Sequence, residues 1–190
     1  MTELALRFAT VLPKNDEGFS MTISMYQVSV PVFLRNLNAL NGVLDKATAF
    51  AEAKKFDHAV LLSTRLYPDM FPLNVQVGQV CTHAARCVAL LAGLPQPDFG
   101  APDTTIAGLK ERVAKTIAFV KTAKPEQIDG TETKDVVVKI GTREIPFKGE
   151  QFLIGFTLPN FFFHYTTAYD ILRSLGLEVG KRDFMGAPPA

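Results

Sequence analysis

The stretch EQFLIGFTLPNFFFHYTTAYDILRSL, residues 150–175, predicts one long helix with apolar side chains around most of its circumference. Phe161, Phe162 and Phe163 are consecutive, so they point in three different directions around the helix axis. A helix that is apolar on nearly all sides lies at the centre of a fold or in a subunit interface. Pro159 predicts either a kink in this helix or a later start, and Gly176 ends it.

Three long segments further upstream repeat apolar residues at steps of three and four, the spacing of amphipathic helices. The first carries Pro31 near its start, which predicts either a proline in the first turn or a kink. The expected helices cover residues 24–55, 72–93 and a segment that runs from a cap at 103–105 toward Pro125, with a short helical turn at 57–63. Together with residues 150–175 they predict an all-α four-helix bundle, a fold that places its sites between facing helices.

The periodicity changes to that of strands at residues 135–147, between the expected third and fourth helices. Two β-prone runs flank Gly141 and Thr142, which predicts a small β-hairpin closed by a two-residue type II′ turn. Pro146 confines the second strand to an edge. Because a two-stranded ribbon is only marginally stable alone, we expect it to lie against the helices or a partner.

Composition indicates a folded protein: 47% of the 190 residues are hydrophobic and 21% are charged. The net charge of +1 provides no field to attract nucleic acid or anionic lipid, and the apolar runs are too short to span a membrane. Fifteen Phe residues and no Trp predict a core packed with phenylalanine. Cys81 and Cys87 lie about 120° apart on one expected helix, so we expect reduced core thiols and a cytoplasmic protein.

The first twenty residues differ from those that follow, because a short apolar run with Glu3 and Arg7 leads into polar helix breakers at 13–18. An amphipathic pattern begins just after Met21, which would itself serve as a start. We therefore expect an N-terminal arm at 1–20, a bundle domain at 21–186 and a C-terminal tail at 187–190.

The chain has three histidines, and two of them are candidates for a site. His58 lies in the polar connector FDHAV and is expected to be exposed. His164 follows Asn160 by four residues, so both lie on one face of the expected fourth helix among apolar neighbours. His83 lies on the flank of the apolar stripe of the second helix. If these two helices face one another, His83, Asn160 and His164 converge.

Two interpretations of this convergence stay open. One is a three-point site for a divalent metal, zinc or nickel, with open coordination positions. The other is a hydrogen-bonded polar cluster without metal, in which neutral imidazoles donate to the Asn160 amide. Neither the nucleophile motif G-x-S-x-G nor a glycine-rich phosphate-binding motif occurs in the sequence.

Segments 21–34, 65–73, 158–173 and 177–186 read MTISMYQVSVPVFL, RLYPDMFPL, LPNFFFHYTTAYDILR and LEVGKRDFMG. In combination they resemble an uncharacterised domain-of-unknown-function family (number 1993) of the DinB/YfiT-like metalloenzyme superfamily. The resemblance implies a DinB-like bundle of up-down-down-up topology that is often a homodimer. It also implies a metal site made of one histidine on the second helix and an H-x-x-x-H pair on the last. That pair falls on Asn160 and His164, with His83 as the candidate on the second helix, so the histidine triad is incomplete here.

Two functional hypotheses follow. The first is a non-catalytic module that binds a small molecule in a Phe-lined cavity or forms a homodimer through the fourth helix. The alternative is a divalent-metal-dependent enzyme, of hydrolase or thiol-dependent transferase type, with the incomplete triad. Neither hypothesis involves nucleic acid or a membrane.

The segment Gly180–Phe184 also has two interpretations. It either closes a cavity, with Phe184 as a plug and Lys181 or Arg182 facing an anionic ligand, or it is a structural clasp with alternating charges. Three tyrosines likewise either supply hydroxyl groups to a pocket or pack in the core, namely Tyr26, Tyr165 and Tyr169.

Overall fold

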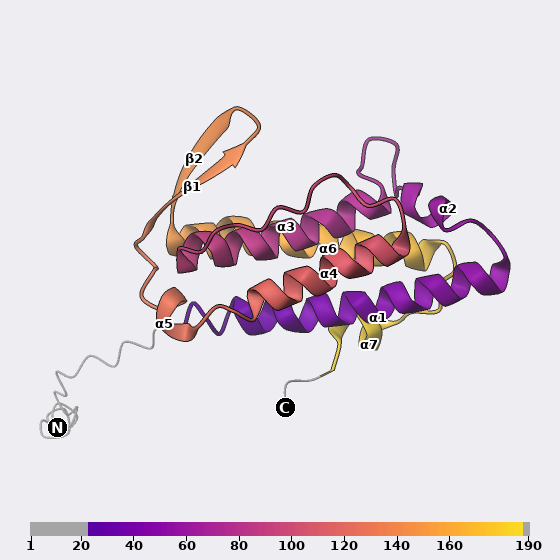
Figure 1. Cartoon of the computed structure of the whole chain (residues 1–190), viewed down its shortest axis with the longest axis horizontal. Coiled ribbons are helices and arrows are strands. Elements are labelled where there is room, and N and C mark those ends of the chain that lie inside the picture. Colours follow the sequence, from indigo (N-terminus) through magenta and orange to yellow (C-terminus); the bar gives the residue numbers. More distant parts are fainter. Residues whose placement is uncertain (1–22, 188–190) are drawn as a thin grey trace, which may run out of the picture.

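The computed structural model describes residues 23–187 (Figure 1). The expected arm at 1–20 and residues 188–190 of the tail lie outside this range. The chain is mostly helical with one antiparallel two-stranded hairpin, which confirms the predicted helical class and the hairpin. The elements in chain order are α1 (Val30–Lys54), α2 (His58–Ser63), α3 (Leu73–Ala92), α4 (Ile106–Val120), α5 (Pro125–Ile128), β1 (Asp135–Ile140), β2 (Arg143–Lys148), η1 (Gln151–Thr157), α6 (Leu158–Ser174) and α7 (Lys181–Met185).

The four long helices α1, α3, α4 and α6 lie side by side along the long axis of the molecule (Figure 1). α3 packs against both α4 and α6, and α1 packs against α4. In Figure 1, α1 and α6 run away from the hairpin end of the molecule, whereas α3 and α4 run toward it. Within residues 23–187, none of these helices combines the length and the apolar character that crossing a membrane requires.

Helix α1 begins later than the sequence pattern suggests. Its first residue is Val30, and the expected start near Ser24 is wrong because residues 25–29 form turns. Asp129 holds these turns, since its Oδ1 accepts from the Ser24 hydroxyl at 2.8 Å and from the Tyr26 backbone N–H at 2.9 Å. Pro31 therefore occupies the first turn of α1, where a missing N–H costs no helical hydrogen bond.

The helix around Pro159 neither starts late nor breaks. Helical structure begins at Gly149, takes the wider π-helical form of η1 from Gln151 and becomes α-helical again at Leu158. Pro159 lies in the first turn of α6, directly after η1. Proline cannot donate to the carbonyl four residues earlier and its ring crowds that carbonyl, and a π-helical turn relieves both constraints.

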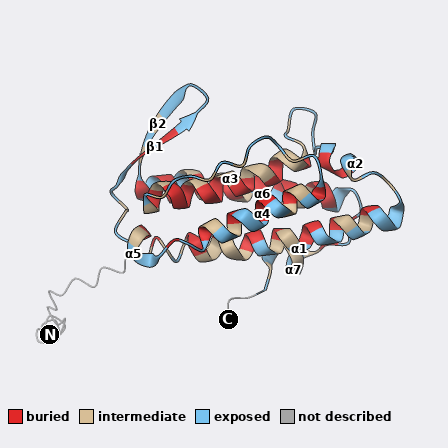
Figure 2. Ribbon diagram, in the orientation of Figure 1, coloured by how far each residue is buried: buried red, intermediate tan, exposed pale blue. Residues whose placement is uncertain are grey.

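Buried and exposed residues alternate along the long helices (Figure 2), and the phenylalanine triplet is buried on one side only. Phe161 is completely buried, and its ring centroid lies 5.0 Å from that of Phe33 on α1. Phe162 is half-buried, and Phe163 is 57% exposed. The expected position at the centre of the fold therefore does not hold for the face that carries Phe163, which leaves a subunit interface as the other expectation for that face. The homodimer through this helix stays a prediction.

The hairpin has the predicted turn. Ile140 pairs with Arg143, which leaves the two residues Gly141 and Thr142 as the turn. Gly141 has a φ of 59° and Thr142 has a negative φ, the combination of a type II′ turn. The base of the hairpin packs on η1, because the Phe147 ring lies 5.3 Å from that of Phe156. The tip projects beyond the helices (Figure 1).

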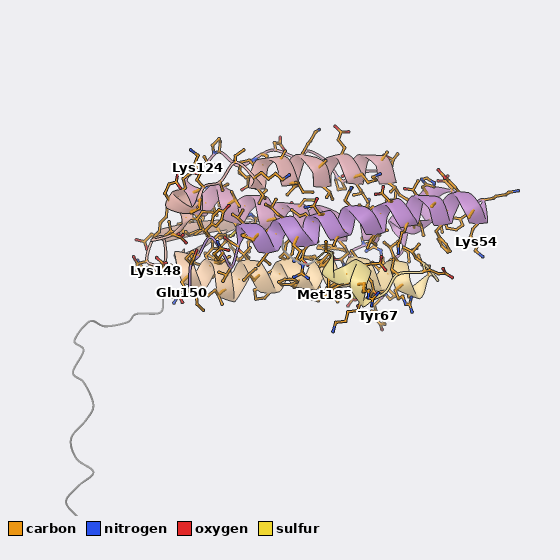
Figure 3. The ribbon with its side chains drawn as sticks, turned by 90° about the horizontal axis from the view of Figure 1, so that it is seen from below. Lys54, Tyr67, Lys124, Lys148, Glu150 and Met185 are labelled. Carbon is orange, nitrogen blue, oxygen red and sulfur yellow. The ribbon has the colours of Figure 1, made fainter. Side chains whose placement is uncertain are left out.

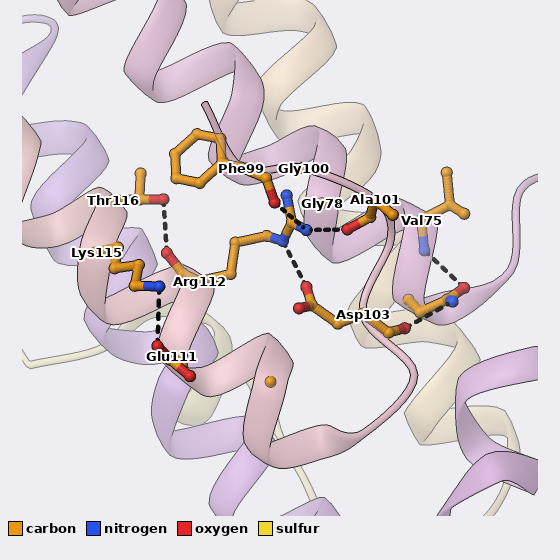
Figure 4. A network of polar contacts seen from close by, with 12 residues as sticks. Val75, Gly78, Phe99, Gly100, Ala101, Asp103, Glu111, Arg112, Lys115 and Thr116 are labelled. Carbon is orange, nitrogen blue, oxygen red and sulfur yellow. Dashed lines mark hydrogen bonds and ion pairs between the residues drawn. The ribbon is translucent and has the colours of Figure 1, made fainter. Parts of the chain in front are cut away.

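A buried arginine ties the long α3–α4 connection to α4 (Figure 4). Arg112 is 7% exposed, and its guanidinium donates to the Asp103 carboxylate and to the carbonyls of Phe99 and Ala101 at 3.0 and 2.6 Å. Of the three capping candidates, Thr105 is the one that caps α4, since its hydroxyl accepts from the backbone N–H of Gly108. A buried guanidinium with this many partners is satisfied in both charge and hydrogen bonding.

The segment at 180–184 forms a clasp rather than a plug. α7 lies against α1 and α6 on the underside of the molecule, where Figure 3 labels Met185. The Phe184 ring stacks on Tyr165 with centroids 4.5 Å apart, and the Tyr165 hydroxyl donates to the Phe184 carbonyl at 2.6 Å. Asp183 pairs with Lys46 of α1. Tyr165 and Tyr169 therefore serve packing and the clasp.

The contrast within the phenylalanine triplet gives a test of where the core lies. Phe161→Ala is expected to lower the free energy of unfolding by about 3–5 kcal/mol, because it removes a completely buried ring. Phe163→Ala removes the same atoms from a largely exposed position and is expected to change it by less than about 0.5 kcal/mol. Urea denaturation of the two variants measures the difference, and equal losses would contradict this description of the core.

Candidate functional site

His83 and His164 lie together in the seam between α3 and α6. Their ring centroids are 5.5 Å apart and the ring planes are inclined by 18°. The two side chains are 6% and 8% exposed, so each touches solvent only at its edge. Two of the three residues that the sequence singled out therefore meet, although 81 positions separate them along the chain (164 minus 83).

Gln76 orients the ring of His164. Its Nε2 donates to the Phe71 carbonyl at 3.1 Å, which turns its Oε1 toward His164. That oxygen lies 2.7 Å from Nδ1 of His164. Because an amide oxygen only accepts hydrogen bonds, Nδ1 must carry the proton. His164 therefore keeps Nε2 as an acceptor.

Asn160 does not accept the hydrogen bonds from the two imidazoles that the interpretation of a polar cluster expects. It is half-buried one turn before His164, and its Nδ2 donates to the Phe156 carbonyl at 2.7 Å. This bond runs back along its own helix, as is common for short polar side chains in helices. The two histidines thus lie together, and the Asn160 amide nitrogen donates to neither of their rings. Metal binding by His83, Asn160 and His164 stays a prediction.

Burial keeps both imidazoles neutral. Desolvation, with smaller contributions from His164 and the positive charge of Arg86, lowers the pKa of His83 from 6.5 to about 3. Desolvation also lowers the pKa of His164. Neutral rings at pH 7 offer a lone pair to a hydrogen-bond donor or a metal ion.

A cavity of about 310 Å³ opens beside His164. Its lining residues come from the α2–α3 connection and from α3 and α6, namely Asp69, Met70, Phe71, Gln76, Phe163 and His164. Phe71 and Phe163 are 50% and 57% exposed, and their ring centroids lie 6.4 and 5.3 Å from that of the imidazole, the first ring nearly parallel to it and the second nearly perpendicular. The cavity therefore has aromatic walls and a polar floor.

A larger cavity of about 720 Å³ lies on the opposite side, between α1 and the segment after α7. It includes Arg35, whose Nε donates to the Met185 carbonyl at 2.7 Å. Among the described residues its lining contains no histidine, cysteine or carboxylate. The candidate site is therefore the smaller cavity beside His164, where oriented polar groups and aromatic rings meet.

The residues available for a metal fall short of a full catalytic site. Within the described part of the chain, no group of three or more His, Cys, Asp or Glu side chains is arranged to hold an ion. Catalytic zinc sites use three protein ligands, and the two imidazoles supply two of them. Cys81 and Cys87 are completely buried, and burial raises the pKa of each thiol to about 12, which confirms them as core thiols.

Sequence reasoning missed part of the cavity. Gln76 lies on the same face of α3 as His83, seven residues earlier, so spacing brings it near the site but does not reveal its bond to His164. Phe71 belongs to an irregular connection and has no periodic signal. His58 begins α2 and is half-buried, so the expectation of full exposure is wrong.

The neutral burial of His83 predicts a pH-dependent stability. The folded-state pKa lies below the unfolded value of 6.5, so the unfolded chain binds the extra proton. The stabilisation is complete above pH 6.5 and is lost as pH falls toward 3, at roughly 1.4 kcal/mol per pH unit. His83→Leu is expected to flatten the slope by this amount in denaturation curves from pH 7 to 4. His58→Ala is the control, and an unchanged slope in His83→Leu would contradict the assignment.

Similarities in sequence and in fold relate the chain to a family and to a solved structure. No curated protein matches it significantly. The crystal structure of a DinB family member protein from Shewanella denitrificans is similar, with a TM-score of 0.75 and 37% sequence identity over 87% of this chain and 93% of that one. The profile of the domain of unknown function DUF1993 matches residues 25–185. The chain therefore belongs to the DUF1993 family, within the DinB-like superfamily.

Proposed function

We propose that this protein is a non-catalytic module that binds a small molecule in the cavity beside His164. Its scaffold in this proposal is a DinB-like four-helix bundle of up-down-down-up topology. One observation carries the proposal: a nearly buried, neutral imidazole with a fixed tautomer forms the floor of a cavity walled by two exposed aromatic rings. Apolar walls with few, well-oriented polar groups are typical of ligand sites.

The two rings at the rim give the cavity an apolar surface that is exposed to water. Phe71 and Phe163 leave half or more of their surface in water although the chain buries other phenylalanines completely. A ligand between them removes apolar surface from water, which stabilises the complex by roughly 25 cal/mol for each Å² buried. The rim therefore favours a ligand with an apolar, planar body.

The imidazole adds a requirement for a hydrogen-bond donor. Gln76 occupies Nδ1 of His164, so Nε2 is the atom that accepts from a ligand. Because His164 is only 8% exposed, a ligand that covers it without donating leaves this acceptor unsatisfied, at a cost of about 1–3 kcal/mol. The site therefore distinguishes a hydroxyl or amide group from a methyl group of similar shape.

Phenol and toluene form a matched pair of probes for this site. Phenol is expected to bind with a dissociation constant in the millimolar range, and toluene at least about fivefold more weakly because it has no donor. NMR titration of the His164 ring proton measures both affinities. Phe163→Ala is expected to weaken phenol binding, while Ile140→Ala, which removes an exposed side chain at the hairpin tip, leaves it unchanged. Equal affinities for phenol and toluene would contradict the role of Nε2.

A divalent-metal-dependent enzyme is the second candidate function. It is supported by the bond from His164 to Gln76, because metal-binding histidines commonly carry such a partner on the nitrogen away from the ion. His83 would supply the second imidazole and Asn160 a weak third ligand. A bound zinc or nickel ion would polarise a substrate carbonyl or a water molecule.

Metal analysis of protein without a histidine tag separates the two candidates. The binding-module proposal predicts less than about 0.1 equivalent of zinc or nickel after dialysis against micromolar metal, since two imidazoles give a weak site. A stoichiometric ion that is lost in His164→Ala and kept in His58→Ala would favour the enzyme instead.

A further inference from the structure

Arg86 on α3 is a half-buried cation without a partner. It makes no ion pair or hydrogen bond with any residue between 23 and 187 through its side chain. By comparison, the buried guanidinium of Arg112 donates hydrogen bonds to one carboxylate and two backbone carbonyls. Burial also lowers the pKa of Arg86, which shows that its charge has lost part of its hydration.

The helices around Arg86 do not supply an opposite charge. α3 contains no Asp or Glu, and Arg86 is its only charged residue. Across the seam, η1 and α6 contain one acidic residue, Asp170. Since α6 runs antiparallel to α3, with Phe156 beside His83 and His164 beside Gln76, Asp170 lies toward the opposite end of the seam from Arg86. Arg86 thus has no opposite charge beside it on α3, η1 or α6.

Arg86 lies on the same face of α3 as Gln76, which lines the cavity, and His83. Gln76, His83 and Arg86 are separated by seven and three residues, which places them on one face of α3 over about 15 Å. His164 lies between the first two, bonded to Gln76 and 5.5 Å from the His83 ring. Phe156 flanks His83 with its ring 5.9 Å away. Along α3, the end that lines the aromatic cavity is therefore followed first by a neutral imidazole and then by a cation.

We propose that the ligand has an apolar body and a single anionic head group, a carboxylate or a phosphate, and that the head group pairs with Arg86 while the body lies between Phe71 and Phe163. This inference rests on the proposed binding function and specifies the class of its ligand. A guanidinium recognises both anions through paired N–H donors, so the two head groups share one chemistry. A partly buried cation gains more electrostatic energy from pairing with an anion than a fully exposed cation does.

The test compares 6-phenylhexanoate with 6-phenylhexan-1-ol, which share a ring and a chain and differ in the charge of the end group. Calorimetric titration of the full chain is expected to show the acid binding about tenfold more tightly than the alcohol. In Arg86→Met this preference is expected to fall below about twofold, and in Arg86→Lys to remain in part. Arg143→Met, which removes an exposed arginine from the hairpin, is the matched control and keeps the preference. A parallel pair, phenyl phosphate and phenol, shows whether phosphate serves as the head group.

Stability provides a second, ligand-free readout. If Arg86 has no structural partner, Arg86→Met leaves the thermal midpoint unchanged or raises it, because an unpaired, partly buried charge is removed. A lower midpoint would show that the arginine serves the fold and would overturn the inference.

The outcomes separate the two proposals. Equal affinity of wild-type protein for the acid and the alcohol overturns the anionic ligand and leaves the cavity as the binding site. A preference for the acid that survives in Arg86→Met overturns the role of Arg86. Binding of neither probe, together with no response to phenol, overturns the proposed function and this inference with it.

Discussion

The hydrogen bond between Gln76 and His164 is the interaction on which the candidate site depends. It joins α3 to α6 across 88 positions of sequence, and it fixes both the amide and the imidazole in one orientation. A second bond, from Gln76 to the Phe71 carbonyl, adds the α2–α3 connection to the same unit. Without these bonds the seam would hold two buried polar side chains with no reason to prefer one rotamer, and the cavity would have no defined floor.

The π-helical start of the last long helix serves the same arrangement. η1 lets the helix pass Pro159 without ending, so that Phe156 and His164 remain on one continuous structure and both contact α3. Inserting a π-helical turn rotates the residues before it relative to those after it. The π-helical segment η1 therefore helps to place the Phe156 ring beside His83 and the His164 imidazole beside Gln76.

Much of the fold follows from local rules, and the site only partly does. The apolar spacing of α1, the extent of α3 and the turn at Gly141 were all predicted, because residue spacing and backbone conformation determine them. The start of α1 was placed too early because Asp129, over a hundred residues away, holds the preceding turns. The meeting of His83 and His164 follows from helix faces, whereas the orientation of Gln76 depends on a loop carbonyl that no periodicity describes. Arg86 has no side-chain partner among residues 23–187, and a sequence cannot reveal such a missing partner.

The projecting hairpin has a consequence for how the molecule behaves at high concentration. A two-stranded ribbon that leaves the body of a protein presents unpaired backbone groups, which favour sheet extension between copies. Here the second strand carries Pro146, which removes one donor, and the ribbon surface carries the Lys139–Glu144 and Lys148–Asp135 ion pairs. Charges and a proline on a short edge oppose that extension. The tip of the ribbon can therefore extend into solvent while the protein resists polymerising through it.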